Sequence, residues 1–139
     1  YFFTLEIAHG VSMLPTIAAA GDWLLISKYY RRGRGVEVGD VISFKHPIYV
    51  GEYATKRLIG LEGDFVLAET PGREGPGRML QIPAGHCWVV GDNVTWSRDS
   101  RMFGALPMAL ITGKILGKVS FSQRWKPIRN ALQPAVDDD

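Results

Sequence analysis

The sequence predicts a mainly β protein whose strands form an antiparallel barrel or sandwich. Short runs rich in β-branched and aromatic residues recur along the chain, and Gly, Pro or Asp residues separate them. The 139 residues include 16 Gly and 8 Pro, a composition that favours many turns over long helices. A chain of this length has room for one compact domain with its own core, so any functional site must lie on this single scaffold.

Six of these runs are the predicted strands, at residues 22–28, 40–45, 53–60, 64–69, 78–82 and 86–91. Gly-Asp pairs mark three of the turns beside strands, at Gly21-Asp22, Gly39-Asp40 and Gly63-Asp64. Residues 70–77 hold no apolar side chain, which predicts an exposed loop. We expect one helical turn at 106–110, before a last strand over about 111–121.

Composition excludes several classes of function. The net charge is only +2, and the sequence contains no stripe of alternating aromatic and basic residues of the kind that binds nucleic acid. Cys87 is the single cysteine, so the chain has no internal disulfide and no thiolate metal cluster. We expect Cys87 to be a small buried apolar residue, and the sequence indicates neither a metal nor a cofactor. No apolar stretch reaches the roughly 18 to 20 residues that span a bilayer.

Two segments carry the candidate chemistry. The first is Gly-Val-Ser-Met-Leu-Pro-Thr at residues 10–16, and the second is Thr-Lys-Arg-Leu-Ile-Gly-Leu-Glu-Gly-Asp at residues 55–64. A serine in a loop, such as Ser12, is usually a turn residue. Strand alternation, however, points Lys56 to one face with Leu58, and Arg57 to the other face with Ile59. One of the two basic side chains must therefore face inward or toward a cleft.

A buried lysine favours the neutral amine, because burial disfavours the charged form. The neutral amine accepts a proton from a serine hydroxyl, so Ser12 and Lys56 are candidates for a Ser-Lys dyad that needs no histidine. The three histidines, His9, His46 and His86, stand at strand or loop edges without a partner pattern. We interpret all three as structural or solvated.

A third segment, residues 91–101, reads Gly-Asp-Asn-Val-Thr-Trp-Ser-Arg-Asp-Ser-Arg. On local grounds it is a polar turn with an Asp99–Arg101 pair, and such a pair contributes little to stability if it is exposed.

Taken in order, the three segments resemble the conserved boxes of the type I signal peptidase family, peptidase S26: SM-x-PT, KR-x-x-G-x-x-GD and GDN...S-x-DSR. Within the family the chain most resembles the fungal form of the mitochondrial inner membrane protease subunit 1 branch. That resemblance rests on Asp99-Ser100-Arg101, on the later residues 105–108 and 113–115, and on Gly33-Arg34-Gly35. The resemblance implies the antiparallel β fold of signal peptidases.

The resemblance also implies roles for individual residues. Ser12 is then the nucleophile and Lys56 the general base, while Ser97 holds the lysine amine and Asp99 with Arg101 forms a supporting ion pair. Bacterial members often carry a hydroxyl residue two places before the nucleophile, for the oxyanion hole. Gly10 stands there, so the Ser12 N–H must supply more of the oxyanion stabilisation.

We expect the substrate to bind as an added strand between residues 10–13 and 53–56, since main-chain pairing recognises an extended peptide regardless of its sequence. The expected substrate contacts are Gly10, Val11, Met13, Tyr53 and Thr55.

The implied function is a serine endopeptidase that removes sorting presequences from proteins delivered to the mitochondrial intermembrane space. Its implied location is the inner membrane, with the catalytic domain facing that space, and its partners are a related second protease subunit and the membrane surface. Residues 1–9 are then the end of a missing N-terminal membrane anchor, residues 10–122 the catalytic domain and residues 123–139 a C-terminal tail.

Three other interpretations stay open at this point. A bacterial or plastid signal peptidase would prefer small residues such as Ala at the cleavage site, whereas the mitochondrial branch resembles an enzyme that also accepts Asn. The self-cleaving repressors share a Ser-Lys dyad, but they carry an upstream DNA-binding helix-turn-helix that this sequence lacks. The third interpretation is a binding module without catalysis.

A basic cluster, Lys28, Arg31, Arg32 and Arg34, is either a solvated face or a contact with anionic lipid or a partner.

Overall fold

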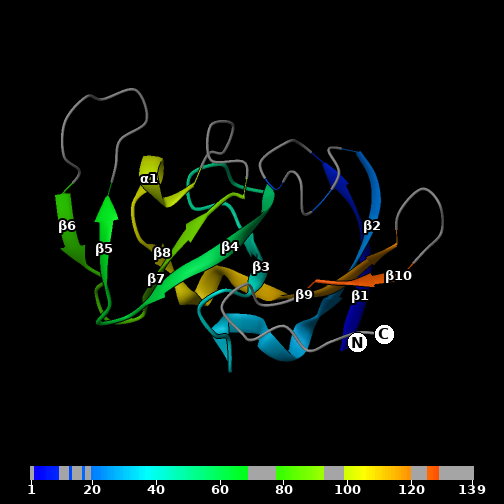
Figure 1. Cartoon of the computed structure of the whole chain (residues 1–139), viewed down its shortest axis with the longest axis horizontal. Coiled ribbons are helices and arrows are strands. Elements are labelled where there is room, and N and C mark those ends of the chain that lie inside the picture. The colour runs from blue at the N-terminus through cyan, green and yellow to red at the C-terminus, as the bar shows by residue number, and fades with distance from the viewer. Residues whose placement is uncertain are drawn as a thin grey trace.

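A computed structural model of the chain describes residues 2–9, 13, 17, 20–68, 78–92, 99–119 and 125–128. For residues 8, 9, 20 and 21 it describes the backbone only. The predicted loop at 70–77 lies outside these residues. The described part is mainly β, which confirms the predicted fold class (Figure 1).

The strands are β1 (Phe3–His9), β2 (Ala20–Ser27), β3 (Val41–Lys45), β4 (Tyr53–Leu61), β5 (Phe65–Ala68), β6 (Arg78–Gln81), β7 (His86–Val90), β8 (Leu106–Pro107), β9 (Ile111–Val119) and β10 (Trp125–Pro127). The helices are α1 (Ser100–Phe103) and the 3-10 turns η1 (Lys28–Gly33) and η3 (Met108–Leu110). No helix of the described residues has the length and apolar character needed to cross a membrane.

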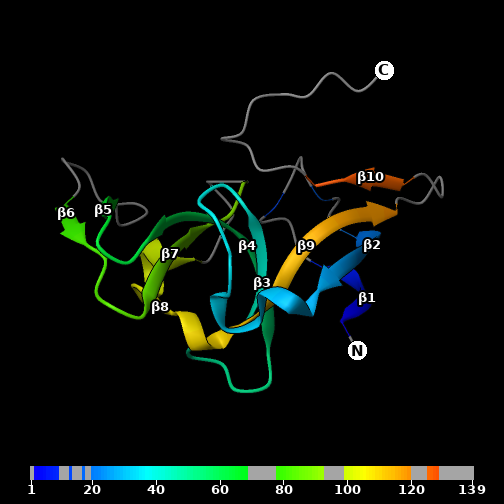
Figure 2. The same ribbon diagram turned by 90° about the horizontal axis from the view of Figure 1, so that it is seen from below.

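The main sheet has eight strands in the order β1-β2-β9-β3-β4-β7-β8, with β10 also paired to β9, and every pairing is antiparallel. Figures 1 and 2 show this sheet curling into a half-barrel, with the separate β5–β6 hairpin at one end. Strand β9 joins the two halves, because β3 pairs with its first residues while β2 and β10 pair with its last residues.

Strands β2 to β7 and β9 lie where the sequence predicts strands, and η3 falls within the predicted helical turn. The main difference is β1, which pairs with β2 from Phe3 opposite Ser27 to His9 opposite Ala20. The sheet therefore starts within residues 1–9, and β10 adds part of the predicted tail to it. The alternation Phe3-Thr4-Leu5-Glu6-Ile7 is a strand pattern, although its apolar side chains are the exposed ones.

Two apolar clusters fill the inside of the curled sheet. The larger consists of Val36, Ile42, Phe44, Leu58, Cys87, Val89, Leu106 and Ile111. The second consists of Met13, Ile17, Leu24, Ile26, Val41 and Ile115. Cys87 is fully buried with a free thiol, as expected, and burial raises its pKa to about 12, so the thiol stays protonated at neutral pH.

The hairpin β5–β6 packs on the main sheet through Val66, Ile82 and Trp88. Gly60 on β4 allows this approach, since a Cβ there would lie 2.7 Å from the Ile82 Cδ1 atom. Packing thus explains the presence of Gly60 in the second motif segment, because a residue without a side chain lets the hairpin lie close to β4.

Candidate functional site

Lys56 lies on β4 opposite Ile42 of β3, and only 6% of its surface is exposed. Its face of β4 continues through the buried residues Leu58 and Gly60. The alternation in the sequence predicts this placement, and the structure selects Lys56 as the basic residue that faces the interior. Strand β4 therefore holds an amine in an apolar environment.

Burial is the main cause of an unusual titration. It lowers the pKa of Lys56 from its ordinary value of 10.5 to about 8. The Asp99 carboxylate opposes this by raising the pKa, and the Arg101 guanidinium adds to the lowering. Because Asp99 and Arg101 form an ion pair, their effects on Lys56 partly offset each other. The result is an amine that is partly neutral just above neutral pH.

Arg57 occupies the opposite face of β4 and is also shielded, with 12% of its side chain exposed. Its Nε and Nη2 atoms donate to the two carboxylate oxygens of Asp92, both at 2.8 Å, and Nη1 donates to the Gly39 carbonyl at 2.7 Å. Sequence reasoning assigned Arg57 no partner. The available signal was its position in a covered strand, because a shielded cation requires a paired anion.

Asp99 is completely buried and caps α1. Its carboxylate accepts hydrogen bonds from the Gly91 N–H at 3.0 Å, from the Arg101 N–H at 3.1 Å and from Arg101 Nε and Nη2, both at 2.9 Å. The Asp99–Arg101 ion pair implied by the resemblance is thus present. Because Asp99 is completely buried, this is a shielded pair rather than the exposed kind that contributes little to stability.

A neighbour in the same motif was missed. Ser100 is buried, and its hydroxyl oxygen accepts from the Val89 N–H at 2.9 Å, which fastens α1 to β7. The DSR tripeptide therefore fixes the short helix through all three of its side chains.

The three motif segments meet at Gly91 and Asp92. Gly91 donates to Asp99, and Asp92 is bound by Arg57. From the first segment, Met13 is buried in the second apolar cluster, and its Sδ atom accepts from the Asp92 N–H at 3.4 Å. The Met13 carbonyl accepts from the Ile17 N–H at 2.9 Å. Residues far apart in the sequence thus converge beside the strand that carries Lys56.

Four predicted site residues, Gly10, Val11, Ser12 and Ser97, lie outside the described residues. Met13 follows Ser12 directly in the sequence, and Asp99 follows Ser97 by two residues. Met13 and Asp99 are therefore the described residues of the first and third segments that lie nearest to these two serines in the sequence.

The predicted substrate contacts on β4 point away from Lys56. Tyr53 is 60% exposed and Thr55 is half-buried, and strand alternation places both on the face opposite Lys56. The backbone of residues 53–56 pairs with β3 on one edge, whereas β7 pairs with β4 only from Arg57 onward. Among the described residues, no strand occupies the other edge of this segment.

The histidines contribute other contacts. The Nδ1 atom of His46 accepts from the Ile48 and Tyr49 N–H groups, both at 3.1 Å, and His86 Nδ1 lies 2.8 Å from the Ala84 carbonyl oxygen. Both rings are therefore held by local backbone, as expected, while the His9 side chain lies outside the described atoms. Within the described part of the chain, no three potential ligands gather to hold a metal ion.

The arrangement provides a group suited to proton transfer, the Lys56 amine on β4. The Arg57–Asp92 ion pair joins the other face of β4 to the residues after β7, and the Asp99–Arg101 ion pair acts electrostatically on the amine.

Comparisons with known proteins identify the family. Residues 1–71 and 68–120 match the family described as signal peptidase, peptidase S26. Mitochondrial inner membrane protease subunit 1 of Saccharomyces cerevisiae is 36% identical over 134 residues, covering 88% of this chain and 70% of that protein.

Two further relatives show the same pattern. Mitochondrial inner membrane protease subunit 1 of Schizosaccharomyces pombe is 34% identical over 126 residues, covering 90% of this chain and 78% of that protein. Subunit 2 of the Danio rerio protease is 32% identical over 129 residues, covering 90% and 68%. The chain therefore belongs to the signal peptidase family, peptidase S26, and is a serine peptidase of the signal peptidase type.

Proposed function

We propose that this peptidase hydrolyses peptide bonds with a Ser-Lys dyad in which Ser12 is the nucleophile and Lys56 the general base. The observation that carries the proposal is the Lys56 amine, buried on β4 beside the meeting point of all three motif segments, with a pKa of about 8. An amine with this pKa has a substantial neutral fraction near neutral pH, and only the neutral form accepts a proton.

In the proposed reaction, Lys56 Nζ takes the proton of the Ser12 hydroxyl while Oγ attacks the scissile carbonyl carbon. The ammonium then returns this proton to the leaving amine as the C–N bond breaks, which leaves an acyl-enzyme. A water molecule, deprotonated by the same amine, attacks the ester carbonyl. The collapse of that second intermediate returns the proton to Ser12 Oγ and releases the carboxylic acid product.

We assign supporting roles to the neighbouring motif residues. Ser97 holds the Lys56 amine in line with Ser12, and the Ser12 N–H stabilises the oxyanion, because Gly10 offers no hydroxyl. Asp99 and Arg101 are positioning residues: their ion pair fixes the segment that carries Ser97 and tunes the Lys56 pKa.

We propose that the substrate pairs, as an extended strand, with the backbone edge of residues 53–56 that no described strand covers, and with the backbone of residues 10–13. Since the Met13 side chain is buried and Tyr53 and Thr55 point away from Lys56, these residues contribute main-chain contacts near the scissile bond. Main-chain recognition suits an enzyme that cleaves many different presequences.

The names of the relatives support a location and a partner. They are subunits 1 and 2 of mitochondrial inner membrane proteases. We propose that this chain also acts at the inner membrane, facing the intermembrane space, as a heterodimer with a related second subunit. Its substrates are then sorting presequences, and peptides with Asn or Ala at the cleavage site would separate this specificity from the Ala preference of bacterial and plastid signal peptidases.

The experiment that tests the dyad is labelling with a serine-reactive fluorophosphonate probe. Wild-type protein is expected to be labelled and Ser12→Ala to lose all labelling, because the hydroxyl is the attacking group. Ser43→Ala is the matched control, since Ser43 is a buried serine hydrogen-bonded to Thr112 on β9. Labelling that survives in Ser12→Ala, or that is absent from folded wild-type protein, would contradict the proposed function.

The pH dependence follows from the Lys56 pKa. Because the neutral amine is the active form, kcat/KM for a presequence peptide is expected to rise with pH and to level off above about pH 8. Free lysine titrates about two pH units higher. A pH–rate profile between pH 6 and pH 10 measures the midpoint, and a profile that is flat, or that falls across this range, would rule out Lys56 as the base.

A further inference from the structure

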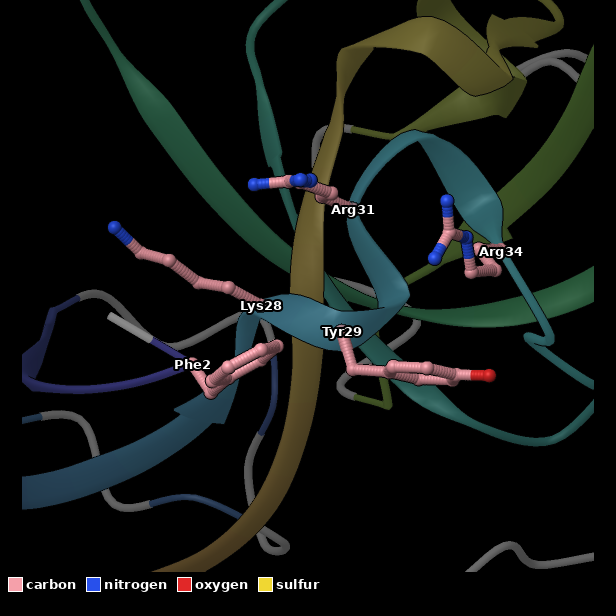
Figure 3. A pocket seen from close by; sticks show the side chains of 5 residues that line it. All are labelled: Phe2, Lys28, Tyr29, Arg31 and Arg34. Atoms are coloured by element: carbon pink, nitrogen blue, oxygen red, sulfur yellow. The ribbon is translucent and has the colours of Figure 1, made fainter.

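A second feature of the surface is independent of the peptidase site. Turn η1 carries the basic cluster noted in the sequence, and three of its members, Lys28, Arg31 and Arg34, line a hollow of about 140 Å³ together with Phe2 and Tyr29 (Figure 3). We call it the basic hollow. Its lining contains three cationic side chains, two aromatic side chains and no carboxylate.

The basic hollow is built on a fixed backbone. The Lys28 N–H donates to the Phe2 carbonyl at 2.6 Å, which joins the start of η1 to the beginning of β1. At the other end Gly33 is buried with φ of +78°, and a Cβ there would collide with Met108 of η3. The positive φ and the close approach of Met108 both favour glycine here, so η1 lies against the core while its charged side chains point outward.

The path of η1 distributes the charges over two adjoining hollows. Arg32 adopts left-handed dihedrals, φ 58° and ψ 20°, which are uncommon for a residue other than glycine. Arg32 lines a second hollow of about 420 Å³, which also contains Lys28, Arg31, Lys45 and the carboxylate of Glu6. Lys28 and Arg31 border both hollows, and Figure 3 shows them extending to the same side of η1.

The cationic side chains of η1 differ in their ion pairing from other cationic side chains of the main sheet. Arg57, Arg101, Lys114 and Lys118 each lie within 3.5 Å of a carboxylate. Among the described residues, Lys28, Arg31, Arg32 and Arg34 form no such ion pair, and the Arg34 guanidinium instead lies 5.7 Å from the centre of the Tyr29 ring. The η1 surface thus presents four positive charges without an ion pair to any described carboxylate, and Glu6 is the carboxylate that lines the second hollow.

We propose that the basic hollow binds the phosphate headgroup of an anionic phospholipid and docks the domain on an anionic membrane surface. Guanidinium groups match phosphate oxygens in a two-pronged geometry, and the lysine adds a point charge. Phe2, which is 71% exposed, and Tyr29, which is 52% exposed, flank the cations and suit the boundary between headgroups and acyl chains. A free phosphate ion would use the cations but gain nothing from these two rings, which is why we assign the lipid.

The test is co-sedimentation of the full chain with vesicles of phosphatidylcholine alone or of an equal mixture with phosphatidylglycerol. Binding is expected only to the anionic vesicles, and it should weaken as salt screens the charges. Each basic residue near an anionic surface contributes about 5-fold, so the double variant Arg31→Glu/Arg34→Glu is expected to bind about 100-fold more weakly or worse. The control variant is Arg78→Glu/Lys126→Glu, which makes the same change in net charge at exposed positions on β6 and β10, away from the hollow. Its affinity for anionic vesicles should stay within a few fold of the wild-type affinity.

A second pair of variants tests the aromatic contribution. Phe2→Ser/Tyr29→Ser should weaken vesicle binding at every salt concentration, while inorganic phosphate should weaken wild-type binding no more than sodium chloride does at the same ionic strength. Cleavage of a soluble peptide by the Arg31→Glu/Arg34→Glu variant should equal that of wild type, which shows that it is folded.

Equal binding to both kinds of vesicle would overturn the proposal, as would equal losses in the two charge-reversal variants. Saturable binding of inorganic phosphate or of an acidic peptide, without vesicle binding, would likewise overturn it and assign the hollow to a different anion.

Discussion

Replacing Lys56 by methionine is expected to lower kcat for a presequence peptide by about 1,000-fold or more, because the only proposed base is removed. Methionine keeps the apolar stem within the β4 environment, so the sheet should remain folded. The amine titrates at about 8 in the native protein and at 10.5 when free, so the unfolded chain binds more protons between these values. Wild-type stability therefore rises with pH across this window through Lys56, and the variant should lack that contribution.

Lys56→Arg should be equally inactive, since a guanidinium stays protonated and cannot accept the serine proton. Lys126→Arg is the matched control: it makes the same chemical change on the exposed strand β10 and should leave turnover unchanged. Peptide cleavage, with circular dichroism to verify folding, measures the three variants. Substantial turnover by a folded Lys56→Met or Lys56→Arg protein would refute the mechanism.

Replacing Asp99 by asparagine is expected to cost about 3 to 5 kcal/mol of stability, because Arg101 would lose the buried carboxylate that accepts two of its N–H groups. The asparagine amide would also present a donor where the Gly91 or Arg101 N–H now donates. For a domain of this size the melting temperature should fall by about 10 °C or more. The measurement is thermal unfolding monitored by circular dichroism.

The same variant should change the titration of Lys56 in a defined direction. The Asp99 carboxylate raises the Lys56 pKa and Arg101 lowers it, so removal of the negative charge should move the midpoint of the pH–rate profile below about 8. Asp64→Asn is the control, because Asp64 is an exposed aspartate whose carboxylate accepts one hydrogen bond, from the Leu61 N–H. If Asp99→Asn had the same melting temperature as Asp64→Asn and wild type, Asp99 would not have the positioning role assigned to it.

Arg57 illustrates the limit of strand alternation as a guide to the role of a residue. Alternation places Arg57 on the face away from Lys56, which the structure confirms, but it indicates no partner for the guanidinium. The structure adds the paired hydrogen bonds to Asp92 and the bond to Gly39. A lysine could not make all three, so Arg57→Lys should loosen the Gly91–Asp92 turn even though position 57 faces away from the base.

Most of the fold was predictable because its signals are local. Period-two alternation and turn residues identify the strands from β2 to β7 and β9 without any knowledge of their partners. Strand β1 was missed because its exposed apolar residues, Phe3, Leu5 and Ile7, read as the end of a membrane segment. Their alternation with Thr4 and Glu6 was the available local signal, and the pairing with β2 is what establishes the strand.

The sequence by itself determined the family: the serine, the lysine in an apolar strand and the Asp-Ser-Arg tripeptide are visible as motifs, and their order indicates it. Tertiary structure decided which basic residue faces inward, that Asp99 is buried rather than exposed, and that Asp92, Arg57 and Met13 lock the three segments together. The physical reason is that burial and ion pairing depend on what covers a residue. The lowered pKa of Lys56 arises from that cover and from charges contributed by another segment, neither of which is encoded within its own strand.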